Sequence, residues 1–359
     1  MFTHKCKQLV LALFAVLIWA LGSSTVAFAV EEPLDQAQIE QSLLQQQQQV
    51  IAAEQLQIQL LQANPQTATA DLWRGIREGE TGFTHSQDAG AGRLINAFGN
   101  DGRLVRNEYV VPALAIAVVG VFGLFLLFYL INGSTKLSHG FSGKLVRRWT
   151  RADMWLHWAM AVSCLAMMFT GLTIMLGRYV LEPMVSSDIW APLIYGGKTI
   201  HDWTGPLFIL FWAICILKWM PVQTFKSYDL KWFLLVGGYI NFGPFKGKHP
   251  DSGFANAGEK MWFWTLVLFG LSISITGILL VLPDLDLSRE TSMLSLLIHG
   301  SSSVILIGFT IVHIWMATVL SEGGLESMSS GYCDENWAVQ HHNLWYDEIK
   351  ANGTLEYKE

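Results

Sequence analysis

The sequence predicts an all-α membrane protein: a four-helix bundle, one extra N-terminal transmembrane helix and a periplasmic N-terminal extension. Three observations indicate this class. First, 52% of the residues are hydrophobic and only 14% are charged, with fifteen tryptophans and twenty phenylalanines, which is typical of a chain that crosses a bilayer several times. Second, five apolar stretches each approach the roughly 20 residues that a bilayer requires. Third, lysine and arginine are concentrated in alternate loops between them.

The first 29 residues are interpreted as a signal peptide. Lys5 and Lys7 precede an apolar run, and Ala27-Phe28-Ala29 has the small-x-small pattern of a cleavage site. An uncleaved N-terminal anchor is the alternative. In both cases we expect residues 30–108 to be exported as a periplasmic extension. Its glutamine-rich run, residues 36–66, is either one amphipathic helix or a low-complexity tether, and residues 71–107 are expected to be loop-like and glycine-rich.

Five predicted spans follow this extension. They are residues 110–131, 154–176, 201–217, 261–282 and 293–320. The first forms the extra helix, residues 109–133, and the other four form a domain of residues 134–325. Residues 326–359 are then a C-terminal tail.

The orientation follows from the short loops, because loops rich in lysine and arginine stay in the cytoplasm. The loops after the first and third spans are basic: they hold Lys136, Lys144, Arg147, Arg148 and Arg151, and then Lys218, Lys226, Lys231, Lys246 and Lys248. The other two loops hold Arg178 with Lys198, and then Arg289. We therefore expect a multi-pass protein of the bacterial inner membrane with its N-terminal extension in the periplasm and its C-terminus in the cytoplasm.

Four histidines in the spans are candidate metal ligands, since ionisable residues within a membrane are functional-site candidates by default. His299 and His313 are fourteen residues apart in the last span. They share a helix face about 21 Å apart along the axis, because a helix rises about 1.5 Å and turns about 100° per residue. His157 opens the second span from the cytoplasmic side, and His201 opens the third from the periplasmic side. Depth then pairs His157 with His313 and His201 with His299.

Two haems, each with two histidine ligands, account for these two level pairs. The alternative without metal is that each histidine bonds a backbone carbonyl or lines a proton path. A non-haem metal is disfavoured, since only Asp153 and Asp202 stand beside the pairs. Small residues near the ligands (Gly171, Gly205, Gly300 and Gly308) suit a flat macrocycle, or equally ordinary packing of membrane helices.

Other features of the sequence narrow the chemistry. The four cysteines are far apart and no CxxCH occurs, so covalent, c-type attachment of the haems is not expected. A haem with histidine on both axial sides has no open position, and it therefore transfers single electrons instead of binding a substrate. The net charge of −6 argues against a nucleic-acid partner. The predicted fold class is thus a four-helix di-haem bundle in a lipid bilayer.

Residues 148–350 resemble the gamma (cytochrome b556) subunit of respiratory membrane-bound formate dehydrogenase. The matching motifs are Leu156-His157-Trp158, Ile200-His201, residues 256–264, residues 295–299, His313 and residues 337–346. The histidines alone would also suit the di-haem cytochromes b of hydrogenases. The Asn256-Ala257-Gly258 loop and the His341-His342 tail favour the formate enzyme.

The resemblance implies the same ligand pairs, with His201 and His299 on the periplasmic haem and His157 and His313 on the cytoplasmic one. It also implies that a quinone, either menaquinone or ubiquinone, binds beside the cytoplasmic haem.

The quinone would lie at Asn256 and Gly258, whose amide and N–H suit a quinone carbonyl. The alternative for these two residues is a plain helix cap. His341 and His342 are expected at a subunit contact.

The resemblance implies partners as well: a catalytic alpha subunit with molybdenum or tungsten and an iron–sulfur beta subunit, both in the periplasm. In anaerobic respiration, electrons from formate would pass inward through the two haems to quinone. The chain itself would anchor the complex and reduce quinone without oxidising formate. The segment through residue 133 exceeds the four-span form of the family. The alternatives are a cytochrome b of a hydrogenase or other quinone-linked oxidoreductase, and a membrane anchor without haem.

Overall fold

The structure, a computed structural model, describes residues 97–282 and 287–358, together with five isolated residues between 48 and 75. Contacts divide the chain into two units, Met1–Leu104 and Val105–Glu359. The predicted signal peptide and most of the predicted extension (30–108) lie outside the described residues. All five predicted spans lie in the second unit. A short helix, α4 (Ala97–Val105), precedes the first of them along the chain.

In the described part of the chain, five helices are long and apolar enough to cross a membrane, which confirms the predicted number. They are α5 (Val111–Asn132), α6 (Arg151–Val180), α7 (Ser187–Trp219), α9 (Ala257–Val281) and α10 (Arg289–Trp315). The first and last are extended by π-helical turns, η1 (Arg106–Val110) and η7 (Met316–Leu320). Short elements join the others: η2 (Glu182–Met184), η3 (Met220–Val222), α8 (Ser227–Leu234), η4 (Val236–Gly238) and η5 (Gly243–Phe245).

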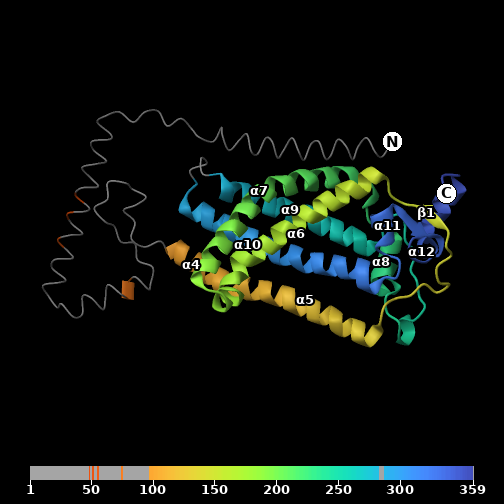
Figure 1. The fold of residues 1–359 in the computed structure, drawn as a ribbon, viewed down its shortest axis with the longest axis horizontal. Coiled ribbons are helices and arrows are strands. Elements are labelled where there is room, and N and C mark those ends of the chain that lie inside the picture. The colour runs from red at the N-terminus through yellow and green to blue at the C-terminus, as the bar shows by residue number, and fades with distance from the viewer. Residues whose placement is uncertain are drawn as a thin grey trace, which may run out of the picture. The chain divides into compact units, whose positions relative to one another are not determined.

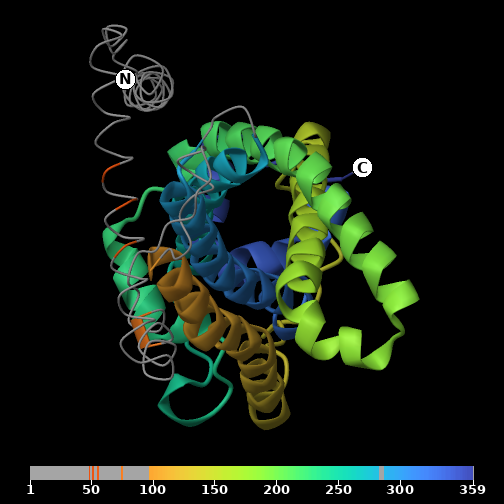
Figure 2. The same ribbon diagram turned by 90° about the vertical axis from the view of Figure 1, so that its left-hand side faces the viewer.

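The long helices lie side by side with their axes roughly along the same direction (Figure 1). α6 packs along α7, and α10 packs along both α9 and α5, the arrangement seen end-on in Figure 2. The largest core cluster joins Met160, Phe208, Trp212, Phe263 and Leu306 from α6, α7, α9 and α10. Many large apolar side chains on the outside of the bundle are exposed instead, as expected of helices that face lipid tails.

The predicted start of the third span at His201 is wrong, because α7 already begins at Ser187. Pro192 and the two glycines after Tyr195 weaken the helical signal of this stretch, since both residue types disfavour helix interiors. Packing overrides that preference. The ring of Trp190 lies against Gly177 of α6, where an added Cβ would come within 2.8 Å of it. His201 is consequently an interior residue of α7.

The C-terminal segment covers one end of the bundle (Figure 1). It forms α11 (Glu326–Ser330), β2 (Tyr332–Asp334), α12 (Glu335–His341) and α13 (Asn343–Ala351). β2 pairs antiparallel with β1 (Leu145–Arg147), with Val146 opposite Cys333. The sequence did not predict this short ribbon, which together with two isolated β-bridges departs from an all-α fold in the described residues. It ties the first basic loop to the tail.

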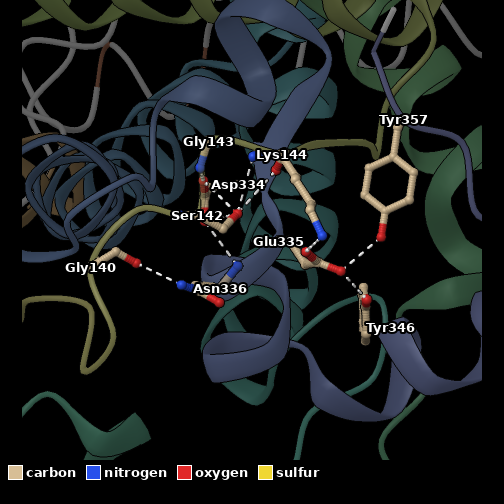
Figure 3. A network of polar contacts seen from close by, with 9 residues as sticks. All are labelled: Gly140, Ser142, Gly143, Lys144, Asp334, Glu335, Asn336, Tyr346 and Tyr357. Carbon is tan, nitrogen blue, oxygen red and sulfur yellow. Dashed lines mark hydrogen bonds and ion pairs between the residues drawn. The ribbon is translucent and has the colours of Figure 1, made fainter.

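Polar contacts fasten this ribbon (Figure 3). Asp334 caps α12 by accepting from the backbone N–H of Asn336 at 2.9 Å, and it also accepts from the N–H groups of Ser142 and Gly143. Glu335 accepts from the hydroxyls of Tyr346 and Tyr357. The hydrogen bond from Tyr346, followed in size by the one from Tyr357, lowers the pKa of Glu335. The loop after α5 and the chain's last residues are therefore one packed unit.

Candidate functional site

The four predicted histidines come together in two pairs. His157 lies on α6 and His313 on α10, and their ring centroids are 6.4 Å apart. His201 lies on α7 and His299 on α10, with ring centroids 6.2 Å apart. These are the same two pairs that depth in the membrane predicts. Because the α10 histidines are fourteen residues apart on one continuous helix, the pairs lie at two levels of the bundle.

The spacing within each pair fits two imidazoles on one metal ion. A metal–imidazole bond is about 2.0 Å long and a ring nitrogen lies about 1.1 Å from its ring centre, so two rings on opposite sides of one metal have centroids about 6 Å apart. The observed 6.4 Å and 6.2 Å agree with that value. Among the described residues no group of three or more histidine, cysteine or acidic side chains could hold a metal. Two histidines alone suit a metal whose other four ligands belong to a macrocycle, as in haem.

Two threonines set the orientation of the rings in the His201–His299 pair. Thr170 Oγ1 lies 2.9 Å from His201 Nδ1, and Thr276 Oγ1 lies 3.0 Å from His299 Nδ1. Each threonine already donates its proton within its own helix, Thr170 to Ala166 O at 2.6 Å and Thr276 to Ser272 O at 2.7 Å. A hydroxyl has one proton, so each oxygen can only accept from the ring. Both Nδ1 atoms therefore carry the proton, which leaves each Nε2 lone pair free for a metal.

A glycine follows each of these threonines and lies against the same ring. A Cβ added to Gly171 would lie 3.5 Å from His201 Cε1, and one added to Gly277 would lie 3.4 Å from His299 Cε1. The glycines let the imidazoles approach the neighbouring helix closely. Gly308, on α10 before His313, has nothing within 4 Å of such a Cβ among the described residues, which leaves space beside the helix for a flat group.

The His157–His313 pair has different neighbours. The ring of Trp262 is stacked on His313, with centroids 5.2 Å apart and planes at 19°. Trp158 meets His157 edge-on at 5.3 Å. His157 Nδ1 is buried and has no hydrogen-bond partner among the described residues. The two pairs thus match in ring spacing and differ in their hydrogen bonds.

Asn256, one of the two predicted quinone residues, is the N-cap of α9. Its Oδ1 accepts from Glu259 N at 2.9 Å, and its own N–H donates to Glu259 Oε2 at 2.9 Å. This reciprocal capping box satisfies two otherwise unpaired N–H groups. Gly258, the other residue, lies in the first turn against Trp232, where a Cβ would approach within 2.7 Å. The capping alternative is thus observed, and a quinone role for both residues stays a prediction.

Buried charges surround this end of α9. Lys260 Nζ lies 2.8 Å from Asp229 Oδ2 of α8, and both side chains are almost fully buried. Arg148 lies 3.4 Å from Glu259 and donates to Phe254 O at 2.7 Å. Its guanidinium also lies 5.0 Å from the ring centroid of Trp337. The start of α9 is therefore fixed by ion pairs to two segments distant in the sequence.

The expectation that His341 and His342 lie at a subunit contact is wrong, because both are buried within this chain. The ring of His341 is stacked on Tyr239 at 5.9 Å. His342 Nδ1 lies 2.8 Å from Gly253 O. Burial, with the neighbouring His342 and His249, lowers the pKa of His341 to about 3. The expectation rested on their position after the last span. Packing against aromatic side chains buries them within the chain instead.

Sequence reasoning missed Thr170 and Thr276, although a signal was present. Both helices that precede a histidine of the His201–His299 pair carry Thr-Gly, as Phe169-Thr170-Gly171 and Ile275-Thr276-Gly277. Trp262 belongs to the motif of residues 256–264, but the sequence indicated no role for this side chain. Its stacking on His313 depends on how α9 and α10 pack, which no local pattern shows.

Comparison with known proteins places the bundle in a family. The model of the prokaryotic cytochrome b561 family matches residues 148–331, about half of the chain. The cytochrome b556(Fdn) subunit of the nitrate-inducible formate dehydrogenase of Escherichia coli K12 is 24% identical over 223 residues, which are 60% of this chain and 97% of that subunit. The formate dehydrogenase cytochrome b556 subunit of Haemophilus influenzae is 29% identical over 198 residues, 54% of this chain and 78% of that protein. The cytochrome b556(fdo) subunit of Escherichia coli K12 is 23% identical over 155 residues, 43% and 71% of the two chains.

Proposed function

The chain belongs to the prokaryotic cytochrome b561 family, and from this premise we propose that it is the di-haem membrane subunit of a formate dehydrogenase. It is an integral membrane protein with five apolar helices among the residues that the structure describes, and its family binds haem b. The relatives named formate dehydrogenase cytochrome b556 subunits support the choice of complex. The observation that carries the proposal is the spacing of the four histidines, 6.4 Å and 6.2 Å within pairs at two levels of one bundle.

In this proposal His157 and His313 hold one b haem, and His201 and His299 hold the other. When bound, the two haems supply one-electron transfer between the two faces of the membrane, from an iron–sulfur partner outside to quinone inside. The chain's own residues hold and orient them. Thr170 and Thr276 keep a proton on the outer Nδ1 atoms, and Trp262 fixes the plane of the His313 ring.

The proposed orientation puts the His157–His313 level toward the cytoplasm of a bacterial inner membrane. Both lysine-rich connections and the C-terminal segment lie at the same end of the bundle (Figure 1), which supports that orientation because basic loops stay in the cytoplasm. The N-terminal division, with a signal peptide (1–29), a periplasmic extension (30–108) and an extra helix (109–133), belongs to the same proposal. So do the four-helix domain (134–325) and the cytoplasmic tail (326–359).

We place quinone beside His313, near the start of α9. Asn256 there uses its carbonyl oxygen to cap the helix, which leaves the two amide protons of its side chain as donors to a quinone oxygen. The Gly258 N–H belongs to the first turn of the helix, where N–H groups lack partners in the helix itself. Menaquinone and ubiquinone both offer the carbonyl that these donors suit.

The partners in this proposal are an iron–sulfur beta subunit and a catalytic alpha subunit with molybdenum or tungsten. The test is formate-dependent reduction of b haem in intact membranes of cells that carry the complex, followed by mass spectrometry of what purifies with the tagged chain. We expect formate to reduce the haem and a large formate-oxidising subunit to co-purify. Reduction of the haem by hydrogen but not by formate would assign the chain to a hydrogenase. Absence of haem b from the membranes would leave the chain as a membrane anchor without haem.

A further inference from the structure

The outer histidines, His201 and His299, share a two-helix arrangement that occurs twice in the bundle. In each copy a Thr-Gly pair on one helix faces a histidine on the next long helix, from α6 to α7 and from α9 to α10. The threonine oxygen accepts a hydrogen bond from the Nδ1–H group, and the glycine leaves room for the Cε1 edge of the ring. Because both His201 and His299 have this Thr-Gly contact, the arrangement is a property of the whole pair and not of one histidine.

The inner histidines, His157 and His313, lack this Thr-Gly contact. His157 Nδ1 is buried without a hydrogen-bond partner among the described residues. His313 contacts the face of Trp262, and in the described part of the chain no threonine or serine hydroxyl is hydrogen-bonded to either inner ring. Ring spacing is nearly equal in the two pairs, so the difference lies in hydrogen bonding and not in the ligand set.

A hydrogen bond from Nδ1–H makes an imidazole a more basic ligand, and a more basic axial ligand favours the ferric over the ferrous state. Each of the two threonine oxygens can only accept from the ring, because its own proton is already donated within its helix. Both axial ligands of the outer site are affected, while His157 of the inner site receives no such bond.

We propose that Thr170 and Thr276 lower the reduction potential of the outer haem below that of the inner haem, and thereby set the direction of electron transfer across the membrane. This inference rests on the proposed function, because it requires a haem on each pair. Electrons move spontaneously toward the higher potential, which here is the His157–His313 level. The two threonines are positioning residues that act through the histidines, and neither touches iron.

The test is a redox titration of the purified protein with chemical mediators, followed by the visible absorbance of the haems. Thr170→Val and Thr276→Val keep the shape of the side chain and remove the acceptor. Each substitution should raise the reduction potential of the lower-potential haem. The preference of that haem for the ferric state should fall by up to about tenfold, which is about 59 mV for a one-electron couple. The potential of the other haem should not move.

Two further variants serve as controls. Thr173 lies on the same helix as Thr170, and its hydroxyl donates to Phe169 O at 2.9 Å; in the described part of the chain it is hydrogen-bonded to none of the four histidines. Thr173→Val should therefore leave both potentials unchanged. Thr276→Ser keeps the hydroxyl and should retain the low potential.

His299→Ala assigns the potentials, since it removes a ligand of the outer haem alone. The haem that remains should titrate at the higher of the two wild-type potentials. If it titrates at the lower one, or if neither valine variant shifts a potential, the inference is overturned. That failure is distinct from failure of the proposed function, in which the wild-type protein would contain no second haem at all. If one valine variant binds no outer haem, the other variant and the His299→Ala assignment still decide.

Discussion

The indole of Trp262 on α9 is stacked on the imidazole of His313 on α10, at 5.2 Å between centroids and 19° between planes. A stacked indole restricts rotation of the imidazole about its side-chain bonds. Groups that orient a metal ligand typically change metal affinity by 10–100-fold when they are removed. Trp262 thus connects the packing of α9 and α10 to the orientation of His313, a proposed haem ligand.

We predict that Trp262→Ala weakens haem binding at the inner site by 10–100-fold, while Trp262→Phe retains most of it because an aromatic ring can still stack. The measurement is haem b per chain in purified protein at limiting haem. The outer haem, whose ligand His299 contacts Thr276 instead, is an internal control. Equal loss of both haems would show that Trp262 supports the bundle in general and not the His313 ring.

The buried pair Lys260–Asp229 gives a prediction about stability. Removing one partner leaves an unpaired buried charge, which costs about 3–5 kcal/mol. Lys260→Met and Asp229→Leu should each lower the free energy of unfolding by that order in detergent. The double variant should recover most of the loss, since an apolar pair of similar volume is often neutral. Additive losses in the double variant would contradict this account.

Gly270 provides a packing test in the core. A Cβ at this position would lie 2.4 Å from Trp212 Nε1, and Trp212 donates that N–H to Leu266 O at 2.9 Å. Gly270→Ala should therefore destabilise the bundle by about 1–3 kcal/mol through overpacking. Gly196→Ala is the matched control on a helix, because nothing described lies within 4 Å of its Cβ. The midpoint temperature of thermal unfolding should fall for Gly270→Ala, and it should not fall for Gly196→Ala.

The tail gives a prediction about pH. Burial lowers the pKa of His341 to about 3, below its ordinary value of about 6.5, so unfolding increases its affinity for protons and acid favours the unfolded tail. Its contribution to stability is complete above about pH 6.5 and declines as the pH falls toward 3. The protection factors of residues 332–346 in hydrogen exchange, which correct for the pH dependence of the intrinsic rate, should fall over this range. His341→Phe keeps a ring against Tyr239 and should reduce that fall, whereas an unchanged profile would assign it to other groups.

Much of the bundle was predictable because its signals are local or periodic. Apolar length gives the spans, and depth along the spans gives the pairs His157–His313 and His201–His299, whose rings the structure brings together. The ends of helices were harder to predict. α7 begins well before His201 because Trp190 packs on α6, a tertiary contact that outweighs local propensity.

The remaining features depend on contacts between distant segments. The β1–β2 ribbon pairs residues almost 190 positions apart, and no periodic pattern in two three-residue strands indicates it. His341 and His342 are polar by type, yet Tyr239 and Trp337 enclose them. Thr170 and Thr276 gain their meaning only once α6 lies beside α7 and α9 beside α10.

The central claim, that four histidines hold two haems in the pairs observed, is tested most directly by haem content in single-ligand variants. We would measure b haem per chain by pyridine haemochrome assay, with redox titration, for His157→Ala, His201→Ala, His299→Ala and His313→Ala. The account predicts about two haems in the wild type and one in each variant, with His201→Ala and His299→Ala retaining the same haem and His157→Ala and His313→Ala retaining the other. Loss of different haems from His201→Ala and His299→Ala, or no haem in the wild type, would contradict it.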